Sequence, residues 1–395
     1  MSVCLRTLGK ATVLLVVLVC VGCGSIVVRS PAPLEQHGEV ALVLGRSDLR
    51  LIADPTAIQS EEETLQALRQ FDPAATSNAE SHVLALSGGG ANGAFGAGLL
   101  AGWTKSGRRP EFDVVTGVST GALAAPFAFL GSDYDETLAE VYTTTSTSDV
   151  LFVRRLLSLF RADSVTESAG LRELVARHID RPLLHKIAAA HGAGRRLFVG
   201  TTNLDSGAPT VWDMGRIASL SDPGALDLFR AVLTASASIP GAFSPVYIPV
   251  EVNGLAYDEM HVDGGVSAQV FAVPARLVGT NSSEEAAGSR HVWVIRNARL
   301  SVEPQQVRPR ISSISLRSVS LMIRTQGIGD LYRIYTLSKR DGVDFNLAYI
   351  SPEFTGESTE AFDMQFMRTL YDFGFQQAAD GRPWLKFPPG YALSE

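Results

Sequence analysis

The sequence has 395 residues, of which 46% are hydrophobic and 19% charged, and its formal net charge is −7. This composition excludes a disordered chain, a collagen-like repeat and a small disulfide-stapled domain. It also argues against a nucleic-acid-binding surface, which is normally basic. The length is sufficient for one large or two ordinary domains with a well-buried core.

The N-terminus has the organisation of an export signal. Arg6 and Lys10 precede an apolar run over residues 11–22. As a helix this run would be about 18 Å long, too short for the roughly 30 Å hydrocarbon core of a bilayer. A run of this length is typical of a signal peptide and not of a spanning helix. All the cysteines of the chain lie in this region, namely Cys4, Cys20 and Cys23.

Cys23 is the candidate lipidation site. It lies in Val21-Gly22-Cys23-Gly24-Ser25, which resembles a bacterial lipobox, although Cys20 replaces the usual leucine. Cleavage there predicts a lipoprotein signal peptide over residues 1–22 and a mature protein held at a membrane by acyl chains. Ordinary secretion and an uncleaved anchor are the alternatives. Gly24, in place of an aspartate after the cysteine, favours the outer over the inner membrane of the cell envelope.

The next segment, residues 23–80, is predicted to be a tether and N-terminal extension with a short helix at 61–68. The organised domain is predicted over residues 81–276, where short apolar strands alternate with helices. This alternation predicts an α/β fold, layered α/β/α, with a mainly parallel central sheet. The predicted strands are Val83–Leu86, Phe112–Thr116, Leu197–Thr202 and Val292–Ile295, with helices at 94–103 and 121–130. Residues 277–395 are predicted to be a C-terminal extension packed on this domain.

Three further local predictions come from the same pass along the chain. Asn253-Gly254 predicts a hairpin turn between residues 247–252 and 255–257. The polar run at 143–148 predicts a flexible loop. The apolar stretch at 149–172 predicts a helix, either packed in the core or acting as a lid.

The first glycine-rich motif is Ser87-Gly88-Gly89-Gly90-Ala91-Asn92-Gly93, directly after a predicted strand. Its G-x-G-x-x-G pattern, at Gly88, Gly90 and Gly93, could indicate a dinucleotide-binding loop. That unit requires an acidic residue at the end of the next strand, whereas Asp113 opens its strand. Three consecutive glycines instead expose backbone amides, as an oxyanion hole requires. A simple packing turn is the remaining alternative.

The second motif is Gly117-Val118-Ser119-Thr120-Gly121, a G-x-S-x-G where a strand turns into a helix. Gly117 and Gly121 relieve crowding at such a turn, which lifts the serine hydroxyl clear of the backbone. The N-terminus of the following helix stabilises developing negative charge. The pattern favours Ser119 as a nucleophile over an ordinary small-residue helix entry.

The third motif is His261-Val262-Asp263-Gly264-Gly265. A serine nucleophile needs a base within hydrogen-bonding reach, usually histidine and sometimes a carboxylate. Asp263, followed by two glycines, is a candidate base, although Asp-Gly-Gly alone is also a turn signal. His261 lies two residues earlier, on the same side of an extended segment, so a Ser119–His261 esterase is an alternative.

These motifs resemble the patatin-like phospholipase family. Ala235–Val246 also matches that family's A-S-x-S-x-P-x-x-F-x-P segment, and the resemblance covers residues 84–274. It implies a membrane-associated serine acyl hydrolase that cleaves lipid acyl esters through an acyl-enzyme. Ser119 would be the nucleophile and Asp263 the general base, while the amides of Gly88, Gly89 and Gly90 hold the oxyanion. No metal and no organic cofactor are implied.

Two departures from the family pattern broaden the predicted substrate. Ser87 stands where the family usually has aspartate, and Asn92 where it has a basic residue. A missing arginine removes a bidentate partner for phosphate, so lipid or other carboxylic esters fit better than phospholipid alone. Asn92 is interpreted as a helix cap or an extra oxyanion donor. The alternative from another class is a non-catalytic envelope lipoprotein that uses the fold for binding.

Overall fold

The computed structural model describes residues 29–33, 41–52, 80–150, 152–153, 166–272, 290–301, 304–381 and 383–391. The predicted signal peptide, Cys23 and the helix at 61–68 lie outside the described residues. No helix within the described ranges is both long and apolar enough to cross a bilayer.

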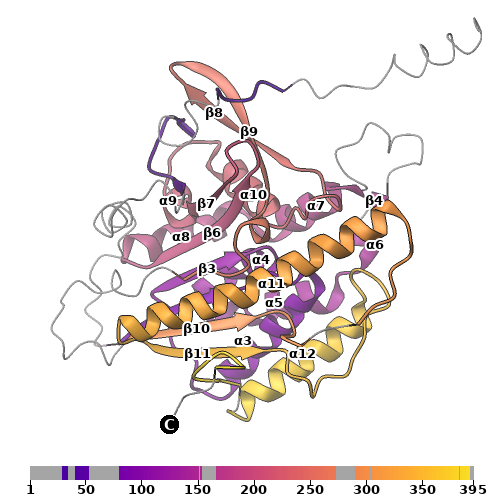
Figure 1. Cartoon of the computed structure of the whole chain (residues 1–395). Helices are drawn as coiled ribbons and strands as arrows, with labels where there is room; N and C mark the ends of the chain where they lie inside the picture. The colour runs from indigo at the N-terminus through magenta and orange to yellow at the C-terminus, as the bar shows by residue number, and fades with distance from the viewer. Residues whose placement is uncertain are drawn as a thin grey trace, which may run out of the picture.

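Strands and helices alternate along the chain, and together they form the predicted mixed α/β fold (Figure 1). The strands are β1 (Arg50–Ile52), β2 (Ser81–Leu86), β3 (Val114–Val118), β4 (Phe152–Val153), β5 (Thr166–Glu167), β6 (Arg196–Asn203), β7 (Ala208–Asp213), β8 (Val246–Val252), β9 (Leu255–Asp263), β10 (Arg290–Arg296) and β11 (Asp344–Tyr349). The α-helices are α3 (Gly93–Lys105), α4 (Thr120–Leu130), α5 (Asp135–Thr144), α6 (Thr147–Val150), α7 (Ala169–His178), α8 (Arg181–Gly192), α9 (Met214–Ala218), α10 (Ala225–Ser236), α11 (Ile311–Arg340) and α12 (Met364–Ala379). Short 3-10 turns are η2 (Gly90–Asn92), η3 (Ser132–Tyr134) and η5 (Gly264–Val266).

The central sheet has nine strands, and its main path runs β1-β7-β6-β3-β2-β10-β11. The five strands from β6 to β11 on this path are mutually parallel, which confirms the predicted sheet type. β7 and β1 extend the sheet antiparallel to β6. β9 also pairs antiparallel with the last residues of β6, and β8 pairs with β9.

Two parallel strands come from beyond residue 276. β10 pairs with β2 over Arg290–Ile295, and β11 pairs with the outer side of β10. Part of the region expected as a packed extension therefore belongs to the central sheet itself. The reason is that β2 would otherwise be an edge strand with unpaired backbone groups.

Each face of the sheet is covered by helices. One face, including Leu84, Val115 and Val199, packs in a core with α3, α4 and α12. The other face, including Val83, Val114 and Val294, packs against Leu331, Ile334 and Tyr335 of α11. In Figure 1, α11 crosses in front of the sheet while α3 and α12 lie behind and below it. Continuous apolar strands are expected where both faces are covered.

The β8–β9 hairpin forms as predicted, with positive φ at both Asn253 and Gly254. The polar run at 143–148 is not an open loop, because it contains the end of α5 and the start of α6. In the stretch at 149–172, only short segments are described, including strands β4 and β5 in place of one helix. The apolar residues 156–160 lie outside the described residues.

Candidate active site

Ser119 lies at a sharp turn between β3 and α4. Its backbone has φ 55° and ψ −126°, a conformation that non-glycine residues rarely adopt. The flanking glycines permit the turn, because a β-carbon at Gly117 would lie 2.5 Å from the Gly121 carbonyl oxygen. A β-carbon at Gly121 would lie 2.4 Å from the carbonyl oxygen of Leu86. The predicted serine elbow is thus present, with its serine at the first residue before the helix.

Asp263 ends β9 and is buried. Its Oδ1 atom accepts a hydrogen bond of 2.7 Å from the Gly265 amide, whereas Oδ2 has no hydrogen-bond partner among the described residues. Burial raises the pKa of Asp263 to about 7, against smaller opposing effects of Ser119 and Gly265. Because burial disfavours the charged form, this carboxylate is a stronger base than an exposed aspartate.

The two residues come together because β3 and β9 meet end to end along β6. Val118, the residue before the serine, pairs with Gly200, and Asp263 pairs with Thr201, the next residue of β6. The Ser119 side chain is near enough to lower the pKa of Asp263, although its hydroxyl makes no hydrogen bond to Oδ2. Such contacts often tighten only when substrate binds.

The glycine-rich loop packs directly on the serine. A β-carbon at Gly88 would lie 3.1 Å from the Ser119 β-carbon, and one at Gly93 would lie 2.2 Å from Thr120 Oγ1. The Gly88 amide donates 3.0 Å to the Gln269 carbonyl oxygen, so it is not free for an oxyanion. This corrects the expectation of three available amides. The Gly89 and Gly90 amides have no acceptor in the described part of the chain.

Asn297, which the motifs did not reveal, holds this loop in place. Its Nδ2 donates a hydrogen bond of 2.9 Å to the Ser87 carbonyl oxygen, and its Oδ1 accepts a hydrogen bond of 3.0 Å from the Gly96 amide. Its own amide donates 2.8 Å to Ser87 Oγ. The available sequence signal was its position directly after β10. Asn92 lies directly before α3, at the position of the predicted cap, but its side chain makes no capping hydrogen bond, so the cap interpretation is wrong.

The segment that resembled A-S-x-S-x-P contacts both ends of the candidate site. Ser236 Oγ accepts a hydrogen bond of 3.0 Å from the Ser119 amide and donates one of 2.6 Å to the Gly200 carbonyl oxygen. The Asp263 amide donates 2.9 Å to the Ser238 carbonyl oxygen. This segment therefore fixes the backbone of the serine and of the aspartate to the end of β6.

His261 belongs to a buried chain of hydrogen-bonded side chains and is not paired with Ser119. Its Nδ1 lies 3.0 Å from Thr201 Oγ1, and its Nε2 lies 3.2 Å from Glu259 Oε2. Trp212 Nε1 donates 2.9 Å to the same threonine oxygen, so the Thr201 hydroxyl is free to donate to Nδ1. Nε2–H then donates to Glu259, which also accepts from Arg50. With both nitrogens engaged, His261 is not arranged as the base for Ser119.

Two more polar residues that the motifs did not reveal lie beside the loop. A β-carbon at Gly88 would lie 2.7 Å from Gln269 Oε1, and one at Gly265 would lie 2.1 Å from Gln269 Nε2. Gln269 thus touches both the glycine loop and the turn after Asp263. Arg296 Nη1 donates 3.2 Å to Gln269 Oε1, and burial lowers the pKa of Arg296 to about 10.

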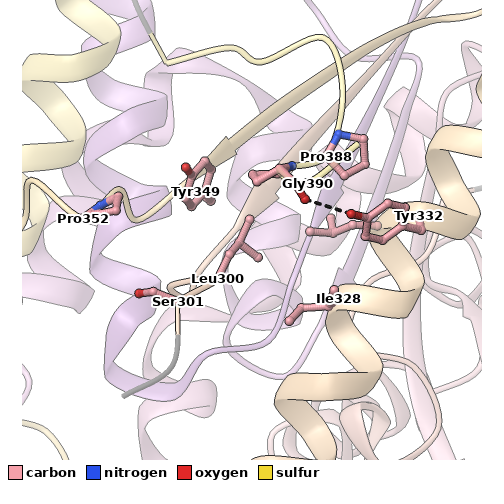
Figure 2. Close-up of a pocket in the computed structure, with 10 residues that line it drawn as sticks. Leu300, Ser301, Ile328, Tyr332, Tyr349, Pro352, Pro388 and Gly390 are labelled. Carbon is pink, nitrogen blue, oxygen red and sulfur yellow. Dashed lines mark hydrogen bonds between the residues drawn. The ribbon is translucent and has the colours of Figure 1, made fainter. Parts of the chain in front are cut away.

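A pocket of about 370 Å³ lies between α11, the end of β11 and the loop before the C-terminus. Figure 2 shows Leu300 and Ile328 lining it, with the Tyr332 hydroxyl donating 2.8 Å to the Pro389 carbonyl oxygen. Its lining does not include Ser119 or Asp263. Among the described residues there is no cluster of three His, Cys, Asp or Glu side chains that could hold a metal ion.

Fold and site together define an α/β protein with a serine elbow beside a buried carboxylate. Residues 84–276 match the model of the patatin-like phospholipase family. This region is therefore a patatin-like phospholipase domain, as the motifs predicted, and the family suggests lipid acyl hydrolase activity.

The crystal structure of VipD from Legionella pneumophila is similar with 12% sequence identity and a TM-score of 0.38. The similarity covers 77% of this chain and 67% of VipD. A search of curated proteins gave no match.

Proposed function

We propose that this protein is a serine acyl hydrolase that cleaves lipid acyl esters with Ser119 as nucleophile and Asp263 as general base. The observation that carries the proposal is that the strands leading to these two residues end side by side at Gly200 and Thr201 of β6, where Ser119 lowers the pKa of Asp263. The unpartnered Oδ2 of a buried carboxylate beside a serine elbow is what a two-residue mechanism needs.

The proposed reaction has two halves. Ser119 Oγ attacks the ester carbonyl while Asp263 takes the hydroxyl proton, and the proton then passes to the departing alcohol. Water, deprotonated by Asp263, attacks the acyl carbonyl, and the bond from the acyl group to Ser119 Oγ breaks to release the fatty acid. The proton passes from Asp263 back to Ser119 Oγ, which restores both residues. The developing oxyanion would be held by the amides of Gly89 and Gly90 and by the N-terminal end of α4.

The proposal is tested by labelling the protein with a fluorophosphonate probe. Wild type is expected to label, Ser119→Ala not to label, and Asp263→Asn to label at a rate lower by about 100-fold or more. Ser106→Ala, at the end of α3, is the matched serine control and should label like wild type. If folded wild type fails to label both with and without detergent, the non-catalytic binding lipoprotein becomes the better description.

We further propose that Cys23 is lipidated and anchors the protein in the outer membrane. The support is the arrangement of Arg6, Lys10, the short apolar run and the lipobox-like segment. The test is incorporation of an alkyne-tagged fatty acid, followed by membrane fractionation. Wild type should carry the tag in the outer-membrane fraction, and Cys23→Ala should lack it. A tagged Cys23→Ala protein would contradict the assignment.

A further inference from the structure

The first half of α11 presents an apolar face that no described residue covers. Its exposed side chains Ile311, Ile314, Leu321 and Met322 are 86%, 51%, 42% and 70% accessible to solvent. These residues recur at helical spacing, so they lie on one side of the helix. We call this surface the α11 face. Clustered exposed apolar side chains of this kind mark a binding surface more often than chance.

The charged residues of the segment that carries the α11 face are all of one sign. Between residues 304 and 329 the chain has Arg308, Arg310, Arg317 and Arg324 and no acidic residue, although the whole protein has a net charge of −7. Arg308 and Arg310 are exposed and immediately precede the helix. The small hydroxyl side chains of Ser315, Ser318 and Thr325 recur on the same side of the helix and are exposed.

The same helix is fixed to the candidate active site. Asp330 Oδ2 accepts 2.7 Å from the Gln269 amide, and Gln326 Nε2 donates to the Ser267 carbonyl oxygen. Gln269 in turn accepts the Gly88 amide at its carbonyl. Val266, three residues after Asp263, is also exposed. In Figure 1, the N-terminal half of α11 projects beyond the carboxyl ends of β10 and β11. The α11 face is thus carried on the side of the molecule where Ser119 lies.

We propose that the α11 face docks on a membrane surface that contains anionic phospholipid. The apolar side chains enter the boundary between headgroups and acyl chains, and Arg308 and Arg310 contact lipid phosphates. Charge complementarity favours this occupant, because arginine pairs with phosphate and the segment offers no opposing carboxylate. The inference rests on the proposed lipid hydrolysis for its purpose, since docking would present Ser119 to lipid esters.

The first test measures contact and needs no catalysis. The full-length Ser119→Ala protein is given a tryptophan by Met322→Trp and incubated with vesicles of brominated phosphatidylcholine, with or without phosphatidylglycerol. Bromine quenches only tryptophan in contact with the bilayer. The quenching added by Met322→Trp should be at least about twofold larger with phosphatidylglycerol. The matched control is His185→Trp on α8, which lies on the other side of the molecule in Figure 1 and should add no quenching.

The outcomes separate this inference from the proposed function. Equal quenching in the two variants, or none from Met322→Trp on vesicle-bound protein, overturns the docking proposal whatever Ser119 does. Quenching in a protein whose wild type resists fluorophosphonate leaves docking standing and removes the hydrolase. If Met322→Ser instead converts a dimer into a monomer, the occupant is a second copy of the chain, and the proposal is wrong.

The second test measures turnover with the full-length enzyme. Ile311→Ser combined with Met322→Ser should lower hydrolysis of vesicle lipid by about tenfold. It should leave kcat/KM for a soluble short-chain ester unchanged, because neither residue contacts the candidate site. An equal loss on both substrates would mean that the substitutions damage the fold, and would contradict a docking role.

Discussion

Ser119 and Asp263 reach each other from opposite directions along a single edge of β6. The strand before Ser119 ends beside Gly200, and the strand that ends in Asp263 finishes its pairing with β6 at Thr201. β3 is parallel and β9 antiparallel to β6, so their carboxyl ends face each other. A β-carbon at Gly264 would lie 2.4 Å from the Gly200 carbonyl oxygen, which shows how closely the two ends abut.

The raised pKa of Asp263 predicts a pH-dependent rate. Burial raises the pKa to about 7, and only the ionised carboxylate can accept the serine proton. For a soluble ester, kcat/KM should therefore rise with pH up to about 7 and level off above it. The measurement is a pH–rate profile between acidic and mildly alkaline conditions. A profile that falls over this range would contradict Asp263 as the base.

The same group should make stability depend on pH. Below pH 3.8, the ordinary pKa of aspartate, the Asp263 carboxyl is neutral in both the folded and the unfolded state. Its ionisation therefore does not affect the free energy of unfolding there. Between 3.8 and about 7 the unfolded state is ionised while the folded state holds the proton, so the folded state loses stability as pH rises. Asp263→Asn should therefore raise Tm at pH 8 and have little effect at pH 4. Asp372→Asn, an exposed aspartate on α12, is the control and should shift Tm equally little at both pH values.

His261 should matter for stability more than for turnover. Burial lowers its pKa, and its two nitrogens bridge Thr201 and Glu259. His261→Gln keeps a donor and an acceptor but changes the geometry, so we expect a lower Tm, with roughly 1–3 kcal/mol lost if one partner stays unsatisfied. Fluorophosphonate labelling should slow by less than about tenfold. A loss of labelling as complete as in Ser119→Ala would instead support a Ser119–His261 pair.

Asn297 should control the geometry of the glycine loop. Asn297→Ala removes the hydrogen bonds to Ser87 and Gly96 and leaves buried backbone groups without partners. We expect kcat to fall by roughly tenfold with little change in KM, because the loop amides act on the transition state. Steady-state kinetics on a soluble ester would measure this. An increase confined to KM would mean that Asn297 contributes to substrate binding and not to loop position.

Gly121 and Gly192 differ in the space that surrounding atoms leave for a β-carbon. In Gly121→Ala the new β-carbon would lie 2.4 Å from the Leu86 carbonyl oxygen, so the strands and helix of the elbow must shift. Gly192 ends α8 and has no heavy atom within 4 Å of the equivalent position. Thermal denaturation should give a markedly lower Tm for Gly121→Ala and a Tm near wild type for Gly192→Ala. Similar Tm values for both would contradict the close packing at the elbow.

The local sequence alone determines several strands, helices and turns of this protein. The apolar strands β2, β3 and β6, the helices after them and the Asn253-Gly254 turn follow from residue type and spacing alone. The family is also visible locally, since Gly117 and Gly121 around Ser119 and the glycines after Asp263 are required by the backbone at those turns. A tight turn depends on a few adjacent residues, so a short sequence motif is enough to predict it.

Only the tertiary structure decided which groups meet. The Gln269 carbonyl oxygen accepts a hydrogen bond from the Gly88 amide, and Asn297 donates one to Ser87, 210 residues earlier in the chain. His261 forms hydrogen bonds with Glu259 and Thr201. These contacts depend on strand order and register, which a local pattern does not contain. Residues of β10 and β11 likewise joined the sheet because β2 had an edge to pair, a long-range requirement that no segment of the sequence carries by itself.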